Sequence, residues 1–287
     1  MISIFKRELK SYFINMTGYV FIGVIWIFSG IISTAINFIG QIAAYEYVMS
    51  YLTIVLMFVI PILSMRSMAE DRRAKTDMLL YSLPINSLQI VLGKYFAMLA
   101  VYGVACLGMG LMPIILSLYG EVHFASACSA ILGFFLLGAA LIAACTFFSS
   151  FTENQLIAAV SGFAVSLGLF LLGTLVGMIP TASVASFIGF AALALLLTAL
   201  VYYLTRNYII TLTVGCVTVI PLSVAYLINP DMFASAFPKA VAYLALFDRF
   251  NNFLNGIFDV GAIVYYISFA IFFIFLTVQS LDKRRWS

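Results

Sequence analysis

The sequence predicts an all-α integral membrane protein with about eight transmembrane helices. Hydrophobic residues make up 64% of the 287 positions and charged residues only 9%, against roughly 25% charged residues in an ordinary soluble domain. The apolar residues gather in uncharged runs of about 20, and the basic residues gather on one side of those runs. A water-soluble surface cannot be built from this composition, so we treat 1–287 as a single transmembrane domain.

Each predicted span is an apolar run without Asp, Glu, Lys, Arg or His, and about 20 such residues cross a hydrocarbon core of roughly 30 Å. The spans are 17–39, 48–65, 95–118, 127–149, 155–178, 183–204, 208–228 and 261–281. Only three residues separate the spans 183–204 and 208–228, so this pair is defined least sharply.

The distribution of Lys and Arg predicts the orientation, because basic residues near span ends stay in the cytoplasm. Of the 14 basic residues, only Lys239 and Arg249 fall on the other side. Both termini are therefore expected in the cytoplasm. The first apolar run has 23 residues, too many for the 7 to 15 of a signal-peptide core, so it is expected to stay in the mature chain.

The first 16 residues alternate apolar and charged positions at helical spacing. Phe5, Leu9, Tyr12 and Met16 recur every three or four residues, with charged residues between them. This pattern predicts a short helix that lies in the cytoplasmic interface.

The cytoplasmic segment 66–94 carries much of the charge of the chain and a short apolar run before Pro84. A charged loop with a small apolar face is typical of a docking surface for a soluble partner. A solvated loop whose basic residues only set the topology fits the pattern equally well. The residues alone do not choose between these two interpretations.

On the other side, the segment 229–260 repeats apolar residues at steps of three or four: Phe233, Phe237, Val241, Leu244, Phe247, Phe250 and Leu254. Polar residues separate them. The pattern predicts one or two amphipathic helices at the outer interface, with a break near Pro238.

Intramembrane proteases, proton-coupled carriers and redox proteins need ionisable or ligating groups at membrane depth. The predicted spans have no acidic, basic or histidine side chain, and the only histidine, His123, falls in the loop 119–126. The four cysteines form no CxxC pair, so we expect no metal site and no catalytic residue. A secondary transporter that uses uncharged polar groups stays open, because Asn37, Thr146, Ser161 and Ser166 lie within or near the spans.

The segment around 66–94 resembles the membrane subunits of type-2 ABC transporters (ABC-2 permeases), and within them the gliding-motility-type branch. The matching positions are Pro61, Glu70, Asp71, Arg72, Arg73, Thr76, Leu79, Leu80, Leu83, Pro84, Leu92, Gly93 and Lys94. The departures are Lys75 where the family usually has Gly, and Asp77 and Met78 where it usually has Leu and Glu. Further matches are the opening 5–10, the stretch 247–256, Tyr265–Tyr266 and the closing 284–286.

The resemblance implies a six-helix core, which would make 180–228 an additional helical hairpin or a segment that enters the membrane and returns. It implies that the loop 66–94 holds a coupling helix for a separate ATPase, with contacts from Glu70, Asp71, Arg72, Arg73, Thr76, Leu79, Leu80, Leu83 and Pro84. It also implies a re-entrant element within 229–260 whose residues Phe247, Phe250 and Leu254 form an outer gate.

The implied function is the permease subunit of a bacterial ABC exporter in the cytoplasmic membrane. Its expected partners are two copies of an ATPase, a second permease that is either the same or a related chain, the lipid bilayer and an extracytoplasmic accessory protein, but no nucleic acid. This chain is expected to bind no cofactor, since Leu88 stands where a phosphate-binding loop before Gly93–Lys94 needs its first glycine. ATP and Mg²⁺ would belong to the ATPase. A non-transporting membrane anchor for an ATPase-driven machine is the alternative.

Overall fold

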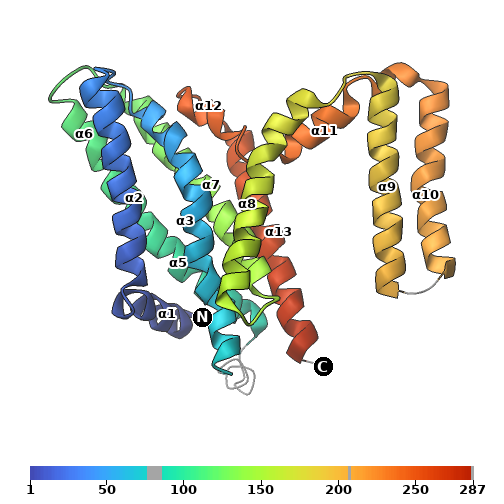
Figure 1. Cartoon of the computed structure of the whole chain (residues 1–287), viewed down its shortest axis with the longest axis horizontal. Coiled ribbons are helices and arrows are strands. Elements are labelled where there is room, and N and C mark those ends of the chain that lie inside the picture. Colours follow the sequence, from blue (N-terminus) through green and yellow to red (C-terminus); the bar gives the residue numbers. More distant parts are fainter. Residues whose placement is uncertain (76–85, 206–207, 286–287) are drawn as a thin grey trace. The chain divides into compact units, whose positions relative to one another are not determined.

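The computed structural model describes residues 1–75, 86–205 and 208–285, and every regular element within these ranges is a helix. The chain forms two compact units (Figure 1). The first unit comprises Met1–Gly168 and Leu246–Ser287, and the second comprises Leu169–Ala245.

The first unit is a bundle of long helices with short helical segments at its ends. Its elements are α1 (Ile2–Ile14), α2 (Thr17–Ser33), η1 (Thr34–Ile39), α3 (Tyr45–Arg73), α5 (Ser87–Met109), α6 (Leu111–Leu116), α7 (Phe124–Ser149), the first part of α8 (Gln155–Met178), α12 (Phe250–Leu254) and α13 (Val260–Arg285). We call the end of this unit that carries α1 and the last turn of α13 the basic end, and the end that carries α12 the far end (Figure 1).

The chain turns sharply between α1 and α2. Met16 has a φ of 58°, in the left-handed region, and the Tyr12 carbonyl accepts a hydrogen bond of 3.4 Å from the Thr17 hydroxyl. One side of α1 is buried through Ile4 and Tyr12. The predicted N-terminal helix is therefore present, and its position in a membrane interface stays a prediction.

The centre of the first unit is α7. In its most apolar stretch 67% is buried within the protein, whereas the corresponding stretches of α8 and α13 are 17% and 22% buried. It packs against α3, α5, α12 and α13. Small residues make this possible: Gly138 leaves room for the ring of Tyr102, whose hydroxyl donates a 2.6 Å hydrogen bond to the Phe134 carbonyl.

The second unit contains the end of α8, the helical pair α9 (Ser183–Thr205) and α10 (Tyr208–Ile228), η2 (Pro230–Phe233) and α11 (Ala236–Leu244). Aromatic rings join these elements, with Phe187 stacked on Tyr226 at 4.6 Å and Phe190 edge-on to Phe237 at 5.2 Å. Pro238 lies in the first turn of α11, where its missing N–H costs no helical hydrogen bond. The break predicted near Pro238 falls just before α11.

Seven predicted spans are helical over their described residues, and the eighth, 95–118, is helical except for a turn at Gly110 and its last two residues. Six helices are long and apolar enough to cross a membrane. These six are Thr17–Ile39, Tyr45–Arg73, Ser87–Leu116, Phe124–Ser149, Gln155–Met178 and Val260–Lys283. Helices α9 and α10 contribute shorter apolar stretches, Ser183–Leu196 and Gly215–Ile228. Six spans agree with the expected family core, and a full crossing by α9 and α10 stays a prediction.

Candidate functional site

The predicted coupling residues begin on the last turn of α3. Glu70, Asp71, Arg72 and Arg73 end this helix, and α5 begins at Ser87. The remaining predicted coupling residues lie outside the described part of the chain: Thr76, Leu79, Leu80, Leu83 and Pro84. The structure therefore describes the two helix ends that flank this segment.

The four α3 residues differ in what they can reach. Arg72 is buried and Arg73 is exposed. Glu70 pairs with Arg66 one turn earlier, at 3.0 Å, and its side chain is 43% exposed. Asp71 pairs with a lysine of α5, so Glu70 and Arg73 are the two of the four that expose most of their charge to solvent.

A buried lysine joins three helices at the basic end. The Lys94 side chain on α5 is 3% exposed, and its ammonium lies 2.6 Å from the Asp71 carboxylate on α3 and 3.4 Å from the Glu8 carboxylate on α1. It also donates a 2.5 Å hydrogen bond to the Ser67 carbonyl. We call Glu8, Ser67, Asp71 and Lys94 the lysine cluster. A buried ammonium with two carboxylates and a carbonyl is well paired, and loss of the ammonium would remove a buried positive charge from beside both carboxylates.

The residue before this lysine explains the close packing of α1. A Cβ built on Gly93 would lie 2.9 Å from Cγ2 of Ile4, closer than carbon atoms approach. Glycine at this position therefore lets α1 lie directly on α5. The Gly93–Lys94 pair, which is among the positions that resemble ABC-2 permeases, has one residue for steric fit and one for charge.

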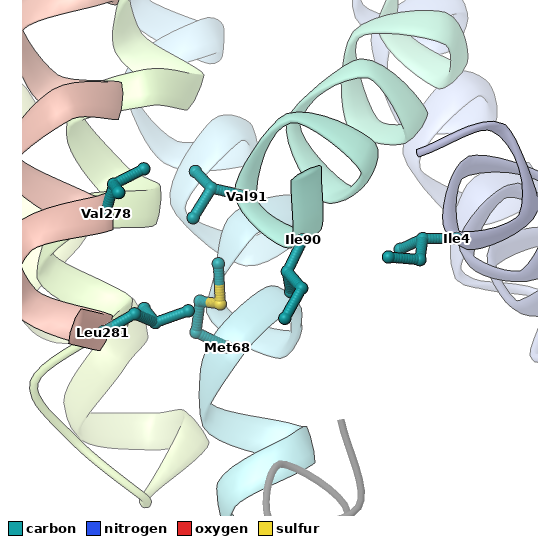
Figure 2. Packing of buried hydrophobic residues seen from close by; sticks show 6 residues of the cluster. All are labelled: Ile4, Met68, Ile90, Val91, Val278 and Leu281. Carbon is teal, nitrogen blue, oxygen red and sulfur yellow. The ribbon is translucent and has the colours of Figure 1, made fainter. Parts of the chain in front are cut away.

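A cluster of buried apolar side chains joins α1, α3, α5 and α13 at the basic end (Figure 2). Met68 of α3 lies in the middle, between Leu281 of α13 and Ile90 of α5, while Ile4 reaches in from α1 (Figure 2). The cluster is completed by Val91 and Val278. All six are less than 10% exposed, so both helix ends that flank 76–85 are packed on a common core.

Two polar contacts attach α13 to the same end. The Ser87 hydroxyl, in the first turn of α5, donates a 2.5 Å hydrogen bond to Asp282, and Ser150 donates to Ser280 at 3.1 Å. Since Ser87 is 4% exposed, the start of α5 is held both by α13 and by the apolar cluster. Helix α5 is thus bonded to α13 through Ser87 and to α1 and α3 through Lys94.

The departure at position 75 has a structural consequence. Lys75 follows the C-terminus of α3 with a φ of 54°, and its N–H donates to the Arg72 carbonyl. This is the left-handed position after a helix at which glycine is favoured, because a side chain is strained there. The glycine that is usual in the family would adopt this left-handed conformation without strain, whereas Lys75 adopts it at a cost.

At the far end, the predicted gate residues Phe247, Phe250 and Leu254 lie in and just before α12. Phe247 and Phe250 are buried, at 8% and 2% exposure, whereas Leu254 is half-buried. Sequence analysis missed Phe253, which is fully buried and packs so closely on Gly133 of α7 that no Cβ would fit there. The steps of three from Phe247 to Phe250 to Phe253 could have revealed it.

The matched stretches 247–256 and Tyr265–Tyr266 meet at this end. The Tyr266 hydroxyl donates to the Leu246 carbonyl at 2.9 Å, and the Arg249 guanidinium lies 4.1 Å from the centre of the Tyr265 ring. Asp259 begins α13 by accepting hydrogen bonds from the N–H groups of Gly261 and Ala262. The Asn252 amide also donates to Asp259 at 2.8 Å and is the main cause that lowers the pKa of this carboxyl.

The polar groups considered for an uncharged transport site are bonded within the chain. Asn37 donates to the carbonyls of Ile42 and Ala44, Thr146 donates to Ile142, Ser161 to Ala158 and Ser166 to Met57. These bonds close turns and join helices, which explains the four residues without a transport role. Within residues 1–75, 86–205 and 208–285, no three His, Cys, Asp or Glu side chains are grouped as a metal site would require.

Comparison with known proteins adds one finding. A family model described as ABC-2 family transporter protein matches residues 9–207, which is more than half of the chain and includes the lysine cluster except for Glu8. No curated protein and no solved structure matches the chain.

Proposed function

The chain belongs to the ABC-2 family of transporter proteins, and on this premise we propose that it is the permease subunit of an ABC exporter driven by a separate ATPase. Membership makes it a membrane transport component that is not itself catalytic. The single observation that carries the proposal is the arrangement at the basic end, where the segment between α3 and α5 starts and ends on helices tied together by Lys94 and the apolar cluster.

The proposed mechanism uses that arrangement as a mechanical connection. An ATPase that binds the segment 70–84 would move the ends of α3 and α5. Because Lys94 pairs with Asp71 and Glu8, and Ser87 bonds Asp282, this movement would be passed to α1 and α13. Rigid packing transmits a displacement of this kind better than separate loops would.

The basic end would face the cytoplasm. It carries Lys6, Arg7, Lys10, Arg66, Arg72, Arg73 and Lys94, and cytoplasmic flanks are enriched in such residues. Both termini would then be cytoplasmic, in the bacterial plasma membrane, and the far end with Phe247, Phe250 and Leu254 would contain the outer gate.

The complete exporter would contain two ATPase copies with their ATP and Mg²⁺ and a second permease, with an accessory protein on the outer side. Alternating exposure of a cavity between the two permeases would move the substrate. The motif positions from Glu70 to Lys94 also favour the gliding-motility-type branch of the family.

Leu80→Asp tests the coupling assignment. We expect the variant to insert into the membrane but to lose at least about 2 kcal/mol of association with the ATPase, because a carboxylate would have to be desolvated at an apolar anchor. Co-purification of the ATPase with the permease is the measurement. Asn154→Asp, which adds the same charge at an exposed position between α7 and α8, outside the segment 70–84, is the control and should retain the partner. Equal retention by both variants would reduce the segment to a topology determinant.

ATP turnover in proteoliposomes separates the exporter from a membrane anchor. An exporter should hydrolyse ATP faster when its substrate is present and should accumulate that substrate in inverted vesicles. Because the substrate is unidentified, cellular extracts serve as its source. If no extract stimulates ATP hydrolysis and no compound accumulates in the vesicles, the membrane anchor is favoured.

A further inference from the structure

A narrow apolar cleft opens between α2 and α3 next to the corner that α1 forms with α2. Its volume is about 220 Å³, and since a water molecule takes up about 30 Å³ of the liquid, this is room for roughly seven methylene-sized groups. Val20, Phe21 and Val24 of α2 line it, together with Val59, Ile62 and Leu63 of α3. All six lie in the helices that are long and apolar enough to cross a membrane.

The cleft has a buried floor and an exposed rim. Phe21, Val59 and Leu63 are 5%, 8% and 3% exposed, whereas Val20 and Ile62 at the rim are 63% and 56% exposed. A packed helix pair would normally bring such rim residues together. Here the exposed rim residues Val20 and Ile62 line an open apolar cleft. A cleft of this form is suited to a single hydrocarbon chain.

One end of the trough is polar. The apolar cleft continues into a small polar recess, and four residues line both: Tyr12, Asn15, Thr17 and Arg66. The recess is completed by Glu8, Ser11 and Glu70. An apolar trough with hydroxyl, amide and guanidinium donors at its mouth matches an amphiphile whose head group lies at the membrane surface and whose chain enters the bilayer.

Exposed basic residues beside the mouth favour an anionic head group. The mouth itself is lined by one basic side chain, Arg66, and by two acidic ones, Glu8 and Glu70, and the adjoining α1 exposes Lys6, Arg7 and Lys10. The two carboxylates are already engaged: Glu8 with Arg7 at 2.6 Å and with Lys94, and Glu70 with Arg66. Basic surface helices attract anionic lipids, and arginine has donors enough to hold a carboxylate and a phosphate together.

We propose that this cleft binds one anionic phospholipid, with one acyl chain between α2 and α3 and its phosphate at Arg66. The site would belong to the membrane around the permease and would not be the cargo cavity. It rests on the proposed membrane orientation only in that the mouth must lie at a lipid head-group layer, so it does not depend on the ATPase or on transport.

The test is retention of lipid by the purified chain alone, measured by native mass spectrometry with phosphatidylglycerol and phosphatidylcholine as probes. The wild type should keep one phosphatidylglycerol per chain and little phosphatidylcholine. Arg66→Gln should lower the apparent affinity for phosphatidylglycerol about tenfold, the effect of losing a charge-assisted bond. Glu70→Gln breaks the same ion pair but frees the guanidinium, so it should retain phosphatidylglycerol at least as well as the wild type.

A second pair of variants tests the trough itself. Ile62→Trp should fill the cleft and reduce retention, whereas Ile157→Trp, at a position on α8 of similar exposure (57%) that does not line the cleft, should not. If phosphatidylcholine is retained as well as phosphatidylglycerol, or if all four variants retain lipid equally, the bound lipid is ordinary annular lipid and the proposal fails. Loss of lipid from Glu70→Gln as severe as from Arg66→Gln would equally overturn the role of Arg66.

Discussion

The two ends of the first unit are held together by different physics. At the basic end a buried ammonium joins α1, α3 and α5 through two carboxylates. At the far end Phe250 and Phe253 of α12 pack on Phe134, Gly133 and Tyr266. Each end anchors a short segment that the proposed mechanism requires to move.

The contrast bears on how each end responds to change. An ion pair in a buried site is sensitive to the loss of either partner, because the remaining charge has no solvent to compensate it. An aromatic cluster loses contacts in proportion to the volume removed. The basic end should therefore behave as one connected unit, while the far end should depend on individual rings.

The largest effect is expected from Lys94→Met. The side chain keeps a similar length but leaves Asp71 and Glu8, 22% and 14% exposed, without their ammonium. We expect about 4 kcal/mol of destabilisation, measured by chemical denaturation in detergent. Lys10→Met, at an exposed position of α1, should change stability by less than about 0.5 kcal/mol.

Adding Asp71→Asn to Lys94→Met should recover part of the lost stability, because it removes the charge of one of the two carboxylates that no longer face an ammonium. Additive destabilisation in this double-mutant cycle would mean that Lys94 and Asp71 do not act as a pair.

The next largest effect should be at the far end. Phe253→Ala should cost about 3 kcal/mol, since it opens a cavity against Gly133 and Tyr266. Leu254→Ala, one position along and half-buried, should cost less than half as much. Denaturation of both variants under one set of conditions compares them directly. A larger loss at Leu254 would contradict the ranking of the two positions by burial.

Much of the helix content could be predicted because apolar length is a local property. The six helices that meet the length and composition needed for a span were all among the predicted spans. The pair α9 and α10 was the least sharply predicted, since Thr205 and two further residues are the only interruption between them. The local sequence pattern does not determine whether α9 and α10 cross the whole membrane or enter it only in part.

Tertiary contacts were harder to predict. The motif residues Asp71 and Lys94 were recognised, yet nothing in their spacing indicates that Glu8 joins them. Phe253 was missed because an amphipathic count with steps of three or four allows either 253 or 254, and only the glycine on α7 decides between them. Asp71 pairs with Lys94 within the chain, which its spacing did not indicate, and its contact with a partner stays a prediction.

A smaller and opposite effect is expected from Lys75→Gly. The left-handed conformation costs a side-chain-bearing residue about 1 to 2 kcal/mol, and the greater freedom of unfolded glycine offsets part of the gain. The net expectation is a stabilisation of about 0.5 to 1 kcal/mol. Ala74→Gly is the matched control, because Ala74 has an ordinary helical φ of −81° and should be destabilised. The same sign of change in both variants would argue against strain at Lys75.

The smallest effect concerns Asp259, the half-buried residue that caps α13 at the far end. The pKa of Asp259 lies below its ordinary value of 3.8, first because Asn252 donates to it and then because of the backbone N–H groups of Ala262 and Gly261. A lowered pKa means that the carboxylate stabilises the folded chain above pH 3.8 and that this contribution is lost as the pH falls through the lower, folded-state pKa. Asn252→Ala should raise the pKa toward 3.8 and lower the unfolding temperature slightly at pH 6, and the difference from the wild type should vanish in strong acid. Carboxyl NMR of Asp259 follows the titration directly, with Asn251→Ala, an exposed neighbour, as the control. An identical Asp259 titration in wild type and Asn252→Ala would show that the amide does not hold the cap, and the far end would then rest on its aromatic rings alone.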